Sequence, residues 1–226
     1  MITKKDIISK IEKLGGAYSP YMIFRDWVTC LALATANTST LNHDKIWEER
    51  EREYKDIMQK YPKDIQNTFP ELTGMLIDLY GSGFDDFLGD IFMKSGCGSS
   101  VTGQFFTPFH LSVLMAEMAV PEEVSEKCIY ELNEPTCGGG ASIIAAAQVM
   151  KERGINYQKC MKVVAQDLDW TAVYMTYIAC SFYGIDAIVV QGVSLADPYH
   201  KGYPEERIFR TPRNRGCLID GGKGEY

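Results

Sequence analysis

Residues 128–144 read CIYELNEPTCGGGASII, and this stretch determines the fold that the rest of the chain can adopt. The run 128–132 suits a short strand, residues 134–140 suit a tight turn, and an alanine-rich helix follows from Ala141. A strand that passes through consecutive glycines into a helix leaves backbone N–H groups free, where a carboxylate, phosphate or ribose can approach. The stretch therefore predicts a nucleotide-binding turn, although three glycines alone could equally form a flexible connection.

Features on both sides of the glycines favour the binding turn. Glu134 stands at the end of the first strand, and the helix after the turn has small residues that allow close packing on a sheet. A second strand, within KVVAQDLD at 162–169, places Asp167 where a carboxylate can accept both hydroxyls of a ribose. Dinucleotide and Walker-type phosphate loops are disfavoured, because Ile143 replaces the third glycine of G-x-G-x-x-G and no lysine lies between Gly138 and Met150.

The pattern after residue 128 alternates strands and helices. We expect strands at 128–132, 161–165 and 187–191, with helices ending near residue 153 and covering 170–183, which indicates parallel β-α-β units. Before this region the spacing predicts helices only, at 4–14, after Ser19-Pro20, and at 42–61, 65–80 and 84–93. A further helix at 109–118 is expected to begin with Thr107 as its cap. The predicted fold class is a mostly parallel α/β Rossmann-like domain at 98–226, preceded by a helical domain at 1–97.

Composition limits the class of protein and its partners. No apolar run is long enough to span a membrane, and the N-terminus has no signal-peptide core, so we expect a cytoplasmic protein without membrane contact. The seven cysteines show no metal-ligand spacing, and the acids at 84–89 fit a helix with one wet and one dry face, so we expect no metal. A net charge of -7 argues that any nucleic-acid contact is local or supplied by a partner.

Three segments, taken in order, resemble a known family. They are GQFFTP at 103–108, EPTCGGG at 134–140 and the pair Gln166-Asp167. The chain resembles the adenine-specific DNA methyltransferases that form the modification subunits of type I restriction-modification systems, including shorter phage-borne relatives. The resemblance covers about half of the chain and fits a helical region ahead of the catalytic core, so residues 98–226 are expected to form the methyltransferase-like domain, complete or incomplete.

The resemblance implies S-adenosylmethionine as the cofactor. By position, Phe105, Thr107 and Pro108 would cover the methionine part. The turn formed by Glu134, Pro135, Thr136, Cys137, Gly138, Gly139 and Gly140 would meet the amino-acid and ribose region. Asp167 and Leu168 would hold the ribose and adenine. The resemblance also implies DNA as the substrate, reached through a separate specificity subunit, in an assembly whose homo- or hetero-oligomeric state stays open.

The catalytic centre of that family is an Asn/Asp-Pro-Pro-Phe/Tyr motif, which this sequence lacks. Three weak substitutes are present: Asp197-Pro198-Tyr199, Thr211-Pro212 and Asp220. Two hypotheses therefore stay open. One is a DNA adenine methyltransferase, and the other is a catalytically inactive protein of the same fold that binds the cofactor or acts as a regulatory or interaction subunit.

Overall fold

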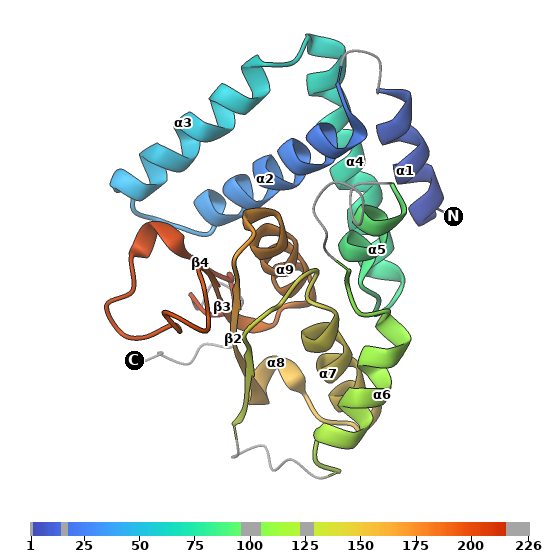
Figure 1. The fold of residues 1–226 in the computed structure, drawn as a ribbon, viewed down its shortest axis with the longest axis vertical. Helices are drawn as coiled ribbons and strands as arrows, with labels where there is room; N and C mark the ends of the chain where they lie inside the picture. Colours follow the sequence, from blue (N-terminus) through green and yellow to red (C-terminus); the bar gives the residue numbers. More distant parts are fainter. Residues whose placement is uncertain (1, 15–17, 96–104, 123–128, 216–226) are drawn as a thin grey trace.

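A computed structural model describes residues 2–14, 18–95, 105–122 and 129–215 of the chain. The first ninety-five residues of the sequence contribute helices that lie above and beside the sheet (Figure 1). These helices are α1 (Lys4–Lys13), α2 (Pro20–Thr38), α3 (Lys45–Gln59), α4 (Lys63–Ser82) and α5 (Phe87–Lys94). The helical region predicted from the sequence spacing is thus confirmed, with shifts of one to three residues at most ends.

Side-chain caps explain where several of these helices begin. The Ser19 hydroxyl accepts a 3.2 Å hydrogen bond from the backbone N–H of Met22, and Pro20 occupies the first turn of α2, as predicted. The predicted start of α5 at residue 84 is wrong, because Asp86 caps the helix instead and accepts a 2.9 Å hydrogen bond from Gly89 N–H.

The predicted cap of the next helix is also wrong. Helix α6 (Phe109–Ala119) begins after Pro108, and no side chain makes a capping hydrogen bond at this end, so Thr107 does not cap it. A proline at this position fixes an extended backbone and lacks an N–H, which starts the helix without help from a hydroxyl.

The sheet has four strands in the order β1-β2-β3-β4. Strands β1 (Tyr130–Glu134), β2 (Met161–Asp167) and β3 (Asp186–Gln191) are parallel, and the short β4 (Ile208–Arg210) pairs antiparallel with β3. The register pairs Glu134 with Ala165 and Asp167 with Gln191, so the carboxyl ends of the three parallel strands lie at the same end of the sheet. The mixed α/β, mostly parallel fold predicted from the sequence is confirmed, and β1 lies about two residues later than expected.

One face of the sheet is covered by helices α7 (Ala141–Glu152) and α9 (Trp170–Tyr183), with the short α8 (Tyr157–Cys160), which the sequence did not predict, between α7 and β2 (Figure 1). Helix α9 is buried along almost its whole length, because α2 packs against its other side. The opposite face of the sheet carries an open hollow of about 900 Å³ lined by Glu131, Lys162 and Asp186 among others.

The larger of two hydrophobic clusters among the described residues joins the N-terminal helices to the sheet. Trp27 of α2, Leu76 of α4, Ile178 of α9 and Val189 of β3 all belong to it and are at most 1% exposed. The expected domain boundary at 97 lies outside the described residues, as do three of the seven cysteines. Cys30, Cys137, Cys160 and Cys180 are buried free thiols. No helix in the described part of the chain is both long and apolar enough to cross a membrane.

A long-range contact fixes β4 to the charged helix α3. Arg50 is only 7% exposed; its guanidinium lies 4.5 Å from the centre of the Phe209 ring and donates a 3.1 Å hydrogen bond to the Ile208 carbonyl. The sequence predicted a solvated helix here, with apolar residues on one side. Arg50 is the exception, because its planar cation packs on an aromatic ring while its N–H groups reach a backbone acceptor.

Candidate functional site

The glycine turn after β1 needs its glycines for backbone conformation. Gly138 has φ +52° and Gly140 has φ +89°, a left-handed region that residues with a Cβ rarely adopt. The N–H of Cys137 donates to the Gln166 carbonyl over 3.0 Å, which ties the start of the turn to β2. The flexible-connection alternative is therefore excluded for this turn, because its backbone is held by hydrogen bonds at fixed angles.

Asp167 at the end of β2 is joined directly to the turn. Its Oδ2 accepts a 2.9 Å hydrogen bond from the backbone N–H of Gly138, and its Oδ1 accepts one of 3.0 Å from Asp169 N–H. On the other side of the turn, the Thr176 hydroxyl of α9 donates to the Gly138 carbonyl over 3.0 Å. The glycine turn and the predicted ribose-binding acid thus form one hydrogen-bonded unit.

The segment ahead of α6 lies against the same turn. A Cβ built on Gly138 would stand 3.0 Å from the Phe106 ring, and this ring stacks on Phe92 of α5 with centroids 5.3 Å apart. Phe105 is 76% exposed, and Thr107 and Pro108 are exposed beside it. The structure therefore brings the predicted segment 105–108 to the glycine turn, through Phe106, a residue that sequence reasoning did not assign.

The other predicted residues of the site divide into exposed and buried groups. Leu168 is 64% exposed, Pro135 and Thr136 are exposed, and Glu134 is half-buried, with Oε1 accepting a 3.4 Å hydrogen bond from Thr136 N–H. The Cys137 side chain is 6% exposed and packs in the core, and burial raises the pKa of its thiol well above the ordinary value. The Cys137 side chain is therefore not available to a ligand.

The N-terminus of α7 offers unused hydrogen-bond donors. No side chain caps this helix, and within the described chain the N–H groups of Gly139, Ala141 and Ser142 have no hydrogen-bond acceptor. Free N–H groups at a buried helix N-terminus favour an anionic group, and the Asp167 carboxylate beside them favours hydroxyls. The donors and acceptors present therefore fit a nucleoside that carries an amino-acid carboxylate, which is the polar composition of S-adenosylmethionine.

Asp86 is a residue at this site that the sequence did not reveal. Its carboxylate is 4% exposed and lies against the turn: a Cβ built on Gly139 would stand 2.7 Å from Oδ2. Burial, with repulsion from Asp85 and Asp90, raises the pKa of Asp86 to about 7. The only sequence signal was a glycine three residues after the acid, which allows the close approach at Gly89.

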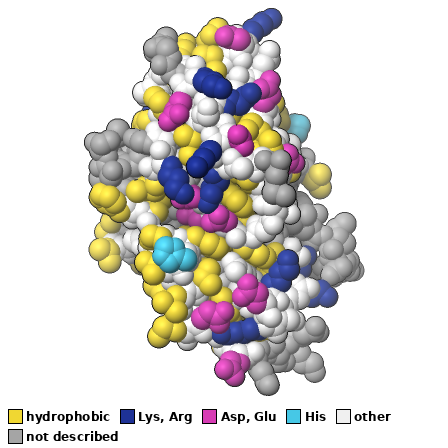
Figure 2. All heavy atoms as spheres, turned by 90° about the vertical axis from the view of Figure 1, so that its right-hand side faces the viewer, with side chains coloured by type: hydrophobic (Ala, Val, Ile, Leu, Met, Phe, Trp, Pro, Cys, Tyr) yellow, Lys and Arg dark blue, Asp and Glu magenta, His cyan; other side chains and the backbone are white. Residues whose placement is uncertain are grey.

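The acids around Asp86 are paired with lysines. The Lys4 ammonium lies 2.7 Å from Asp85 Oδ2 and also contacts Asp90, which Lys94 pairs with over 2.7 Å. Figure 2 shows the face that carries α1, α5 and α6, where basic and acidic side chains lie side by side among hydrophobic ones. Among the described residues, no three His, Cys, Asp or Glu side chains form a metal-binding group.

The first weak catalytic candidate lies in the irregular segment after β3. The buried Gln166 carboxamide holds this segment, since Nε2 donates to the Asp197 carbonyl and Oε1 accepts from Tyr199 N–H, both over 3.0 Å. The Asp197 side chain is exposed and lies 3.3 Å from His200 Nε2, and Pro198 is exposed. The end of β2 thus contacts both the glycine turn, through Asp167, and this segment, through Gln166.

The second candidate, Thr211-Pro212, contributes a buried hydroxyl to the sheet. Thr211 is fully buried; its hydroxyl donates to the Ile185 carbonyl over 2.8 Å and accepts from Ala187 N–H over 3.0 Å. This side chain continues the pairing of β4 with β3 and has a structural role. Asp220 lies outside the described residues.

A comparison with protein families identifies the fold that carries this site. A family model described as N-6 DNA Methylase matches residues 77–210, more than half of the chain. The chain belongs to the N-6 DNA methylase family. The match begins within α4 and ends with β4, so it includes Asp86, the glycine turn and Asp167 in this methylase. No curated protein matches the chain.

Membership indicates a general activity. N-6 DNA methylases transfer a methyl group to the exocyclic N6 of adenine in DNA and typically use S-adenosylmethionine. The sequence resemblance is confirmed at the level of this family.

Proposed function

We propose that this methylase binds S-adenosylmethionine in the cradle formed by the glycine turn, Asp167 and segment 105–108, and methylates adenine N6 in DNA. The observation that carries the proposal is the hydrogen bond between Gly138 N–H and Asp167 Oδ2. It fixes a carboxylate beside a set of free backbone donors, and these two kinds of group match the ribose hydroxyls and the methionine carboxylate.

Each element of the cradle has a distinct task in this proposal. The free N–H groups of α7 bind the carboxylate of the ligand, and Asp167 accepts hydrogen bonds from the ribose while it still holds Gly138. The exposed Leu168 and Phe105 side chains offer apolar surface to the adenine and methionine parts. When bound, the cofactor supplies an electrophilic methyl group on a sulfonium, and the protein orients it towards the target amine.

The DNA contact is proposed to depend on a partner. The chain has a net charge of -7, and a surface that neutralised many phosphates would need an excess of lysine and arginine. We therefore favour a restriction-modification-like assembly in which a separate specificity subunit reads the DNA, as the family resemblance implies. A methylase of this kind would bind the adenine after it leaves the base stack.

A second candidate function is cofactor binding without methyl transfer. The sequence has no Asn/Asp-Pro-Pro-aromatic motif. Within the described residues β1 also has a strand partner on one side only, and Asp197 and Thr211 do not reproduce the motif. In this version the same cradle binds S-adenosylmethionine, and the protein acts as a regulatory or interaction subunit.

Two measurements test the proposals separately. Thermal unfolding with and without millimolar S-adenosylmethionine tests the cradle, because a ligand well above its Kd must raise the Tm. Absence of stabilisation would reject cofactor binding in both versions. Incorporation of tritiated methyl groups into unmethylated duplex DNA, with and without a specificity subunit, then tests catalysis. Stabilisation without incorporation in either condition would support the second candidate, and loss of incorporation in Asp197→Ala would assign a role to that segment.

A further inference from the structure

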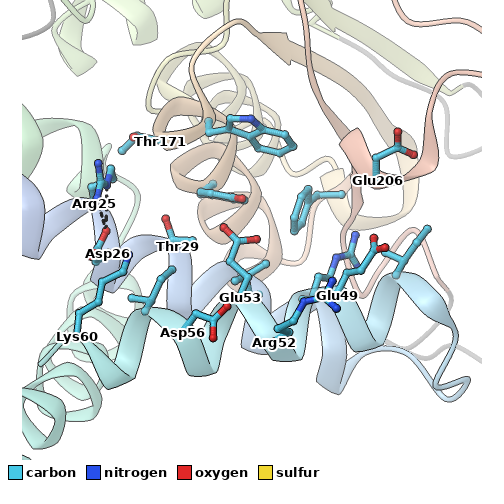
Figure 3. A pocket seen from close by; sticks show the side chains of 17 residues that line it. Arg25, Asp26, Thr29, Glu49, Arg52, Glu53, Asp56, Lys60, Thr171 and Glu206 are labelled. Carbon is cyan, nitrogen blue, oxygen red and sulfur yellow. Dashed lines mark hydrogen bonds and ion pairs between the residues drawn. The ribbon is translucent and has the colours of Figure 1, made fainter.

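A groove of about 640 Å³ separates the N-terminal helix α3 from α9 and β4. Figure 3 shows it from close by, with α3 along the bottom and α9 above. Its lining differs from that of the cofactor cradle: it contains neither the glycine turn nor Asp167. One wall is aromatic and the opposite wall is charged, and these two walls define the chemistry of a ligand.

The aromatic wall consists of three rings. Trp170 and Tyr174 stack with centroids 5.4 Å apart and planes at 28°, and Phe209 meets Tyr174 edge to face at 5.3 Å. Trp170 is 37% exposed, so part of its indole remains accessible. The Arg50 guanidinium at 4.5 Å from the Phe209 ring shows that this wall already holds one planar cation at its end.

The charged wall presents a carboxylate without a counter-ion. Glu53 reaches from α3 towards α9 (Figure 3), and it forms no ion pair or hydrogen bond with another residue of the described ranges. Desolvation raises the pKa of Glu53, with repulsion from Asp26 and Asp56 adding to it and Lys60 opposing it. Glu53 and Tyr174 both line the groove, and burial together with the charge of Glu53 raises the pKa of Tyr174.

The basic residues of the groove leave Glu53 without a partner. At one end, Arg25 lies 2.7 Å from Asp26 and Lys60 lies 3.9 Å from it, so both cations face the same carboxylate. At the other end, Arg50 is held by β4. The remaining charges along the groove are Glu49, Arg52, Asp56 and Glu206, of which Glu49 pairs with Lys45 over 3.4 Å. Acidic groups thus outnumber uncommitted basic ones around Glu53.

We infer that this groove binds an organic cation, a guanidinium or alkylammonium group, between the Glu53 carboxylate and the rings of Trp170 and Tyr174. A cation there would neutralise the carboxylate of Glu53, which is exposed to the groove, and contact the electron-rich face of the Trp170 indole, which is 37% exposed. The same chemistry is carried by an arginine or lysine side chain of a protein partner and by a free small cation.

The first experiment measures binding of N-acetyl-arginine amide to the full chain by calorimetry, with the isosteric uncharged N-acetyl-citrulline amide as the control ligand. A single cation in a groove of this kind should bind with a Kd on the order of 1 mM. Binding should weaken at least about tenfold in Glu53→Gln and in Trp170→Leu, and citrulline should not bind. The matched control Glu48→Gln removes an exposed carboxylate from the same helix outside the groove and should leave the Kd unchanged.

The second experiment distinguishes the source of the cation. Spermidine and a glycine-serine peptide with one central arginine are titrated into the same variants. Tighter binding of the peptide that is lost in Glu53→Gln supports a protein partner, whereas tighter binding of spermidine lost in the same variant supports a free cation. The inference is rejected if no cation binds at concentrations about tenfold above the expected Kd. It is also rejected if the Glu53→Gln variant binds N-acetyl-arginine amide as tightly as the unchanged protein does, and the unchanged protein binds N-acetyl-citrulline amide equally well.

Discussion

Gly138 and Asp167 are joined by a 2.9 Å hydrogen bond from a backbone N–H to a carboxylate, although 29 positions separate them in the sequence. The bond closes the glycine turn over the end of β2. Asp167 therefore holds the shape of the turn and, in the proposed function, also accepts hydrogen bonds from the ribose hydroxyls.

Replacement of Asp167 by alanine should therefore weaken cofactor binding. We expect the Kd for S-adenosylmethionine to rise at least about tenfold, because a hydrogen bond to a charged group contributes about 1.5–3 kcal/mol. Calorimetry measures the change, and Glu131→Gln, which alters an exposed acid on β1, serves as the control. An unchanged Kd in Asp167→Ala would remove this residue from the site.

Gly140 should be more sensitive to alanine than Gly154, another glycine with positive φ. A Cβ there would stand 3.2 Å from Thr176 Oγ1 and would adopt φ +89°, whereas Gly154, at φ +75°, has open space around it. We expect Gly154→Ala to lower the free energy of unfolding by about 1 kcal/mol and Gly140→Ala by about 2–3 kcal/mol. Urea denaturation compares the two, and equal losses would show that the packing against Thr176 has no energetic weight.

Asp86 should make stability depend on pH near neutrality. Its folded-state pKa of about 7 lies above the ordinary value of 3.8, so the native state keeps a proton that the unfolded state releases between these values. Stability contributed by this group is therefore present below pH 3.8 and is lost as the pH rises towards 7. The charged groups that act on the Asp86 carboxyl are Lys4, which lowers its pKa, and Asp85 and Asp90, which raise it. The charge of Asp86 in turn contributes to the raised pKa of Tyr80.

The variant Asp86→Asn tests the sign of this effect. It keeps an oxygen that can cap α5 and removes the charge, so it should raise the free energy of unfolding at pH 8 by about 1–3 kcal/mol and change it little at pH 4. Asp90→Asn should act in the opposite direction at pH 8, because its lysine partners lower the pKa of Asp90. If Asp86→Asn lowered the free energy of unfolding at both pH values, the ionised carboxylate would not destabilise the native state, and the prediction would be wrong.

Thr211 should behave as a structural residue. Thr211→Val keeps the shape of the side chain and removes a hydroxyl that makes two hydrogen bonds to β3 and the residue before it, which should cost about 1–3 kcal/mol of stability. Thr211→Ser restores the hydroxyl and should recover most of this loss. Chemical denaturation of both variants measures it, and a neutral effect of valine would contradict the assignment.

The sequence allowed the prediction of local structure where a single residue type determines it. The alternation of strands and helices, the cap of α2 and the span Trp170–Tyr183 of α9 followed from patterns within a few residues of each position. The start of α5 did not, because Asp85 and Asp86 are adjacent acids that could both serve as its cap. The start of α6 did not either, because Pro108 begins this helix without a side-chain cap.

The contacts that complete the site join segments that are distant in the chain, and local sequence patterns do not predict such contacts. Phe106 lies against Gly138 and also stacks on Phe92 of α5, so three distant segments meet at its ring. In the sequence, Asp86 is one of several acids on a predicted amphipathic helix, and only the fold brings Gly139 against its carboxylate. Gln166, next to the predicted Asp167, holds the segment at 197–199 through its side chain, which no spacing rule could show.

The contact of Arg50 with Ile208 has a consequence for the order of folding. The two residues are 158 positions apart, so the ribosome must add that many residues after Arg50 before the guanidinium can donate to the Ile208 carbonyl. Contacts of such separation close late, since chain entropy is lost before they form. Until then, β3 presents an unpaired edge during synthesis, the period in which nascent strands are most open to association with other chains.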